Sequence, residues 1–204
     1  MNGEAKSSAL GWSEAMTGVN RINLAGTGGY YFPNPAALNG LRESRTGNWL
    51  DVGPSSGTQT FNFMTLWLDH GANPTDAAYQ YAILPNFTSS ETDAYASSPE
   101  FVVLENSNEA QAVKETGLKI VGANFWKNMI KTVDIITSNK KASVTAKETG
   151  NEMEVAVSDP TQMNEETIEI EIHKSARNVV VKDPKITVTQ LSPTIKLIVD
   201  VNGS

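Results

Sequence analysis

Residues 66–86 read LWLDHGANPTDAAYQYAILPN, and the expected fold depends most on this stretch. It consists of two apolar runs joined by a polar loop. Across residues 61–68 apolar side chains occupy both sets of alternating positions, which predicts a strand buried on both faces. The loop contains the chain-breaking sequence GANP, and residues 79–85 then place two tyrosines and an isoleucine on one face of a second strand. The stretch therefore predicts a long β-hairpin within a larger sheet.

Short motifs within and around this stretch occur in a consistent order. They are DHGxNP at 69–74, YxYxxLPN at 79–86, GTGGYYFP at 26–33, RESRTGNW at 42–49, GANFW at 122–126, KASV at 141–144 and VAVSDPT at 155–161. Together they resemble polysaccharide lyase family 8, which contains the hyaluronate, chondroitin AC and xanthan lyases. The resemblance covers residues from about 26 to 161, and beyond that point only the strand pattern supports it.

The resemblance implies where the chain belongs in such a lyase. Residues 1–100 resemble the C-terminal part of the central β-sandwich domain, and residues 101–204 resemble the C-terminal β-sandwich domain. The predicted fold class is all-β, with antiparallel sandwich domains in which the end of a large layered sandwich precedes a smaller one. The short strands separated by Gly, Pro, Asn and Asp turns favour the same architecture.

The second half contains the clearest strand signals. Isoleucines alternate with charged or polar residues over 167–174, and apolar residues alternate again over 195–201, so each segment predicts a strand with one wet face. Two short helices are also expected. Thr88-x-x-Glu91 is a capping-box pattern that opens a helix to about Ser97, and Asn106-x-x-Glu109 suggests a second helix that ends at Gly117.

Composition limits the classes of partner. The 204 residues carry a net charge of −7, which argues against nucleic acid or an anionic membrane as a partner. No run approaches the ~20 apolar residues of a membrane span. The polar residues 1–11 do not form a signal peptide. Because the family is exported, the resemblance implies a secreted protein whose export signal belongs to a longer parent chain.

Four clustered residues are candidates for substrate binding. Arg42 and Arg45 lie close in sequence to Asn48 and Trp49. Arginine side chains grip carboxylates and an indole face stacks on sugar rings, which is the chemistry that an acidic polysaccharide requires. The alternative is structural: the arginines pair with Glu43 or Asp51, and Trp49 belongs to the core.

The two histidines have different expected roles. His70 is a general base, a ligand-contacting side chain at a strand end, or a turn residue oriented by Asp69 or the backbone. His173 lies on the polar face of an alternating strand and is expected at the surface. Trp12, Trp67 and Trp126 stand in apolar contexts and are expected in the core.

Metal and cofactor chemistry have little support. The sequence has two distant histidines, no cysteine and no calcium-loop spacing, so we expect neither a metal nor a cofactor. No set of nucleophile, base and orienting residue is recognisable, and no catalytic residue is predicted. In the family the catalytic residues come chiefly from an N-terminal helical domain, which this chain lacks.

Three functions remain open from the sequence. The first is a non-catalytic C-terminal portion of a polysaccharide lyase, which supports the catalytic domain and lines the glycan cleft. Its partners would be an acidic polysaccharide and either the N-terminal helical lyase domain or a second copy. The second is an independent carbohydrate-binding or surface adhesion module. The third is an active lyase.

Overall fold

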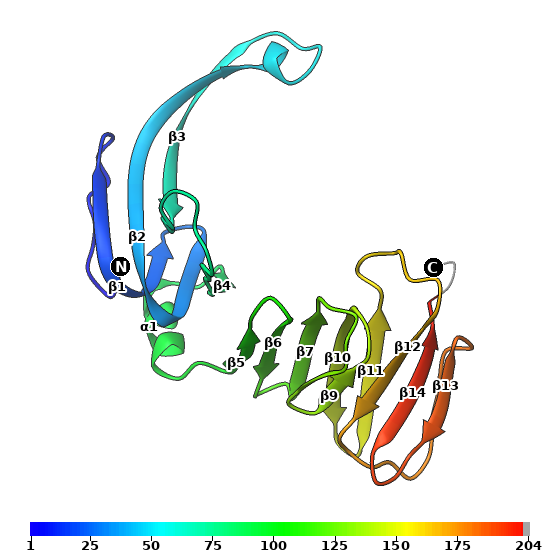
Figure 1. Ribbon diagram of the computed structural model, residues 1–204. Coiled ribbons are helices and arrows are strands. Elements are labelled where there is room, and N and C mark those ends of the chain that lie inside the picture. Colours follow the sequence, from blue (N-terminus) through cyan, green and yellow to red (C-terminus); the bar gives the residue numbers. More distant parts are fainter. Residues whose placement is uncertain (202–204) are drawn as a thin grey trace. The chain divides into compact units, whose positions relative to one another are not determined.

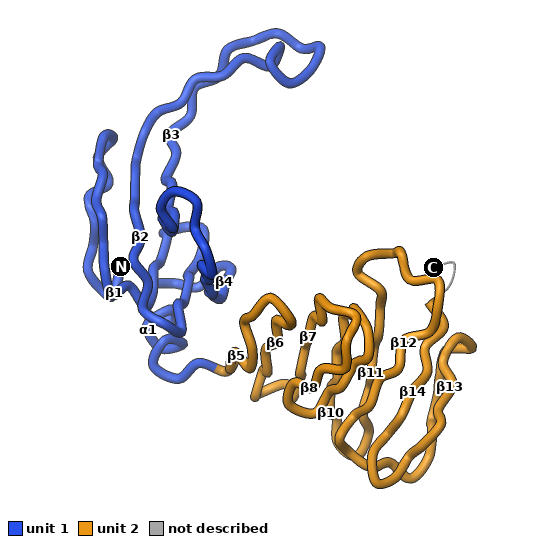
Figure 2. The backbone as a smooth tube through the Cα atoms, in the orientation of Figure 1, with its two compact units in different colours: residues 1–99 blue, residues 100–204 orange. Residues whose placement is uncertain are grey.

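A computed structural model describes residues 1–201, and they form three antiparallel sheets connected by turns and one helix (Figure 1). The chain divides into two units, Met1–Pro99 and Glu100–Ser204, which are coloured separately in Figure 2. The all-β, antiparallel fold class predicted from the sequence is confirmed. None of the helices in the described residues is long and apolar enough to cross a membrane.

The sheet of the first unit is organised around one long strand. The strands are β1 (Ser13–Leu24), β2 (Gly28–Asn48), β3 (Thr58–Trp67) and β4 (Ala82–Pro85). One edge of β2 pairs with β1. The other edge pairs with β4 near the start of β2 and with β3 near its end. The predicted hairpin between residues 61–68 and 79–85 is therefore wrong, because β3 and β4 do not pair with each other and instead pair with different parts of the same edge of β2.

Two proline residues within β2 do not end the strand. Pro33 and Pro35 lie within β2, and the strand continues through them. Val19 of β1 pairs with Ala36, whereas Arg21 pairs with Tyr31, so the prolines lie in a bulge of β2. A bulge accommodates residues that lack an amide donor without ending the strand.

The far parts of β2 and β3 form a two-stranded ribbon, which we call the arm (residues 42–64). The pairing of β1 with β2 stops at Leu41, and β2 and β3 continue together to a tip at the 3₁₀ turn Trp49–Asp51 (Figure 1). Residues 58–63 of β3 are all exposed, so the prediction of a strand buried on both faces is wrong for this part.

The apolar cluster of the first unit lies between β1 and β2. Its buried members are Met16, Val19, Ile22, Phe32 and Leu38. Trp12 packs against this cluster as expected, and Gly40 makes room for it, because a Cβ at Gly40 would lie 2.6 Å from the indole ring.

Helix α1 (Ser89–Ser97) confirms the first predicted helix. Thr88 is its N-cap, and the side chain accepts a hydrogen bond from the Glu91 amide at 3.3 Å. The Glu91 carboxylate in turn accepts a hydrogen bond from the Thr88 amide at 2.8 Å, which completes the capping box.

The second unit is a sandwich of two five-stranded sheets. In sheet order one contains β11 (Glu152–Ser158), β10 (Ala142–Thr149), β7 (Ile120–Phe125), β6 (Ala110–Glu115) and β5 (Phe101–Asn106). The other contains β13 (Ile186–Gln190), β14 (Ile195–Asp200), β12 (Thr167–Ile172), β9 (Ile136–Ser138) and β8 (Lys131–Val133).

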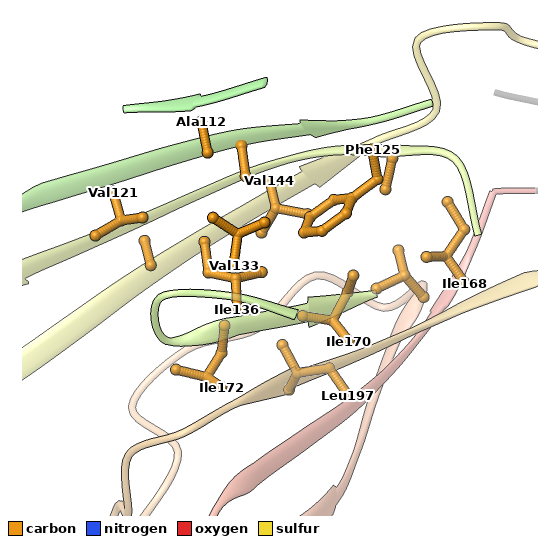
Figure 3. Close-up of a cluster of buried hydrophobic side chains, with 14 of the residues drawn as sticks. Ala112, Val121, Phe125, Val133, Ile136, Val144, Ile168, Ile170, Ile172 and Leu197 are labelled. Carbon is orange, nitrogen blue, oxygen red and sulfur yellow. The ribbon is translucent and has the colours of Figure 1, made fainter. Parts of the chain in front are cut away.

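The core of the second unit fills the space between these sheets. In Figure 3 Phe125 and Val144 face the isoleucines of β12, and Leu197 of β14 lies beside them. Ile168, Ile170 and Ile172 are at most 1% exposed. The predicted alternation of β12 and β14 is thus confirmed, with one apolar face on the core.

The second predicted helix, over residues 106–117, is wrong. This segment forms the hairpin of β5 and β6. Ser107 closes the turn, because its amide donates to the Ala110 carbonyl at 2.9 Å and its hydroxyl accepts from the Glu109 amide at 3.1 Å. Ala110 and Ala112 then alternate into the core. The same short sequence pattern fits a serine that closes a turn and a residue that caps a helix. The pattern therefore could not distinguish the hairpin from the predicted helix.

Candidate functional site

The two candidate arginines lie on opposite faces of β2. Side chains two residues apart share a face of a strand, so Arg42 and Arg45, which are three apart, point to opposite sides. Arg42 is paired with Met64 and Arg45 with Phe61. The structure therefore does not bring these two side chains together as a single carboxylate clamp.

Arg45 lies on an aromatic face of the arm. Its Nε donates to Glu43 at 2.6 Å, and its guanidinium carbon is 5.5 Å from the centroid of the Phe63 ring. The pairing with Glu43 is the structural alternative that the sequence suggested. The side chain is nevertheless 54% exposed, and Phe61 and Phe63 beside it are both exposed. A guanidinium on an aromatic surface can still bind an anion from solvent.

Arg42 faces a cavity of about 640 Å³ in the first unit. The cavity is lined by Met64, Lys6 and Arg21 among others. Lys6 is ion-paired with Glu14 at 2.7 Å, and Arg21 is ion-paired with Asp93. Within residues 1–201, the buried Nε of Arg42 has no hydrogen-bond partner. A buried donor without a partner is costly, so this atom is a local weakness of the first unit.

Asn48 and Trp49 lie at the tip of the arm. The Asn48 side chain accepts a hydrogen bond from the Leu50 amide at 3.0 Å, and Asp51 accepts one from the Asn48 amide at 3.3 Å. Asn48 therefore shapes the tip as a cap. Trp49 is 53% exposed, which shows that its predicted core alternative is wrong.

His70 lies in the loop between β3 and β4, where it contacts an aromatic side chain. Its ring is 6.1 Å from the Tyr79 ring, with an angle of 26° between the planes. The Asp69 carboxylate beside it accepts a hydrogen bond from the Gly71 amide at 2.8 Å. Tyr79 and Tyr81 were predicted in a strand, and the contact between Tyr79 and His70 was not predicted. The YxY spacing of residues 79–81 was the sequence feature that could have indicated an aromatic cluster here.

The remaining aromatic and histidine predictions had mixed outcomes. Trp67 and Trp126 are 39% and 37% exposed, so placing them in the core was wrong. His173 is exposed as expected, and its Nε2 is 2.8 Å from the Thr137 hydroxyl. In the described part of the chain, no group of three or more His, Cys, Asp or Glu residues could hold a metal ion.

Comparisons with known proteins agree on one family. Residues 1–96 match the model of the polysaccharide lyase family 8 super-sandwich domain, and residues 102–168 match that of the family 8 C-terminal β-sandwich domain. All of the chain aligns with a xanthan lyase of Bacillus sp. (strain GL1) at 48% identity and covers 23% of that protein. A hyaluronate lyase of Thermasporomyces composti is 33% identical over 98% of the chain, which covers 26% of it.

Solved structures show the same similarity. The structure of a Paenibacillus xanthan lyase superposes with a TM-score of 0.93 and 51% identity. The match covers 98% of this chain and 20% of that one. The present chain thus spans about a quarter or less of the length of these relatives.

Proposed function

Because the chain belongs to polysaccharide lyase family 8, we propose that it is the non-catalytic C-terminal portion of a lyase that cleaves an acidic polysaccharide by β-elimination. The observation that carries the proposal is the small share of each relative that the chain covers, at 23% and 26% for two lyases. Both matched domains are sandwich domains. The proposal assigns residues 1–100 to the end of the central domain and 101–204 to the C-terminal domain.

The proposed role is to support the catalytic domain and to line one wall of the glycan cleft. Arg42 and Arg45 would contact carboxylates from the two faces of β2, and Asn48 and Trp49 would act at the tip. The exposure of Arg45 and Trp49 supports this assignment. His70 would contact the polysaccharide from its own loop. The lyase would act outside the cell.

The arm is the part that would contact the partner. A two-stranded ribbon is marginally stable by itself in water, and this one carries exposed apolar residues along β3 and at its tip. A helical lyase domain in the same polypeptide, or a second copy of the chain, would cover the exposed residues of β3, and Trp49 at the tip would stay open to the polysaccharide.

An activity assay tests the non-catalytic assignment. Incubate the 204-residue chain with hyaluronan, chondroitin and xanthan, and follow the ultraviolet absorbance of unsaturated uronate. We expect no increase above background. Turnover of any of the three would show that the chain is an active lyase.

A binding assay tests the role of Arg45. Replacing one charged contact in Arg45→Ala should weaken hyaluronan binding in affinity electrophoresis by about tenfold, or about 1.4 kcal/mol. Arg177→Ala is the matched control, because Arg177 is an exposed arginine in the second unit. Equal retardation of Arg45→Ala and Arg177→Ala by hyaluronan would contradict the role of Arg45 in binding.

The second candidate function is an independent carbohydrate-binding module. The exposed aromatic residues of the first unit favour it, since aromatic faces bind sugars without a catalytic domain. Joining the chain to a helical lyase domain distinguishes the two functions. A C-terminal portion should raise the activity of that domain, whereas an independent module should leave it unchanged on short substrates.

A further inference from the structure

We propose that His70, Tyr79 and Tyr81 form a subsite for neutral sugar residues, separate from the arginine-bearing arm. We call these three residues the aromatic row. The inference rests on the proposed function in one respect, namely that the chain contacts polysaccharide. It adds a second position on the chain and a different chemical class of ligand.

The rings of the aromatic row are evenly spaced and nearly parallel. The ring centroids of His70 and Tyr79 are 6.1 Å apart, and those of Tyr79 and Tyr81 are 6.2 Å apart. The corresponding angles between ring planes are 26° and 20°. The row is thus an extended series of similarly oriented rings, which suits a ligand made of repeating rings.

One end of the row is anchored in the core of the first unit. The Tyr81 ring lies 6.2 Å from Tyr30 and 6.0 Å from Phe32. Phe32 is a buried member of the apolar cluster, and Tyr30 packs against that cluster. At the other end, the hydrogen bond from the Gly71 amide to Asp69 shapes the loop beside His70. The packing of Tyr81 reduces the conformational freedom that a ligand would have to restrict.

The row remains available to solvent despite this anchoring. Tyr79 is 60% exposed and Tyr81 is 44% exposed. Tyrosine and histidine combine an apolar ring with a polar edge, so they pack on the C–H face of a pyranose and hydrogen-bond its hydroxyl groups. Exposed phenylalanine and tryptophan dominate the arm instead, and that composition suits a protein surface better.

The charges near the row select against acidic sugars. Residues 68–81 contain Asp69 and Asp76 but no lysine or arginine, and none occurs anywhere between Arg45 and Lys114. A carboxylate-bearing sugar at the row would meet the negative charge of this loop, and the loop itself offers no positive partner. A neutral pyranose avoids this repulsion, so we commit to a neutral segment of a polysaccharide as the occupant.

Isothermal titration calorimetry of the 204-residue chain with cellohexaose, a neutral β-glucan, tests the proposal. Wild type should bind cellohexaose, and Tyr79→Ala should weaken binding by about tenfold, while Tyr79→Phe should stay within about threefold. Phe61→Ala is the control, because Phe61 is an equally exposed ring on the arm. It should leave cellohexaose binding unchanged.

The outcomes separate this proposal from the acidic-glycan proposal. Arg45→Ala should weaken hyaluronan binding and leave cellohexaose binding intact, whereas Tyr79→Ala should do the reverse. Absence of cellohexaose binding by wild type would overturn the subsite, and so would wild-type affinity in Tyr79→Ala. A preference for a hyaluronan hexasaccharide at the row would overturn its neutral specificity. Circular dichroism melts of each variant check that the fold is retained.

Discussion

At the scale of single residues, Asp159 shows how one side chain can organise a turn. One carboxylate oxygen accepts from the Thr161 amide at 2.9 Å and from its hydroxyl at 2.7 Å. The other accepts from the amides of Met163 and Asn164 at 3.0 and 2.8 Å. Burial tends to raise the pKa of Asp159, but these hydrogen bonds outweigh it and lower the pKa to about 2.

This lowered pKa predicts a dependence of stability on pH. The stabilisation by Asp159 should be complete above its ordinary pKa of 3.8 and should be lost as the pH falls toward about 2. Asp159→Asn should therefore lower the melting temperature at pH 7 and flatten its change over this acidic window. Asp76→Asn is the control, since Asp76 is an exposed aspartate with a positive φ that asparagine tolerates. Identical acid profiles for wild type and Asp159→Asn would contradict the prediction.

The candidate residues were only partly predictable from the sequence. The pairing of Arg45 with Glu43 follows from their spacing of two along a strand, which places both on one face. The same rule separates Arg42 from Arg45, but applying it required knowing that β2 continues unbroken through this segment. The contact of His70 with Tyr79 was not predictable, because it depends on the path of an irregular loop.

At the scale of elements, the sequence predicted a strand or helix correctly where the pattern lay within that element alone. Alternating isoleucines defined β12, and the capping box defined α1. The pairing of strands depends on distant segments, so the sequence suggested a hairpin where β2 serves both β3 and β4 as partner. The exposure of β3 was likewise unpredictable, since apolar residues usually indicate burial.

The capping box of α1 predicts a specific loss of stability. Thr88→Ala removes the acceptor for the Glu91 amide and should lower the free energy of unfolding of the first unit by about 1 kcal/mol. Thr88→Ser keeps the hydroxyl and should recover most of this loss. Chemical denaturation that reports on the first unit measures the difference. Equal destabilisation by alanine and serine would show that the hydroxyl is unimportant.

The alternation of β12 predicts opposite effects for neighbouring residues. Ile170 is 1% exposed, so Ile170→Ala should leave a cavity and cost about 2–5 kcal/mol. Glu169 lies on the exposed face, and Glu169→Ala should change stability by less than about 0.5 kcal/mol. Urea unfolding of the two variants measures both effects. Comparable destabilisation by both would contradict the assigned register.

At the scale of the whole molecule, the two units differ in how completely they bury their apolar residues. The second unit encloses its core between two sheets. The first unit has a smaller cluster and leaves Phe61, Phe63 and Trp67 at 59%, 43% and 39% exposure. At ~25 cal/mol per Å² of apolar area, a few hundred Å² left uncovered forfeits several kcal/mol, which is comparable with the net stability of a domain.

This difference predicts unequal hydrogen exchange in the isolated chain. The amides of β12 and β14 should be strongly protected, because opening them requires loss of the whole second-unit core. The amides of the arm beyond Leu41 should exchange rapidly, since only two strands hydrogen-bond there and no buried layer covers them. The experiment is done at low concentration, with the monomeric state established by sedimentation. Raising the concentration is the control for a second copy, because self-association would protect the arm selectively. Strong and equal protection of both units in a proven monomer would show that the arm needs no partner, and the support role proposed for it would then have to be abandoned.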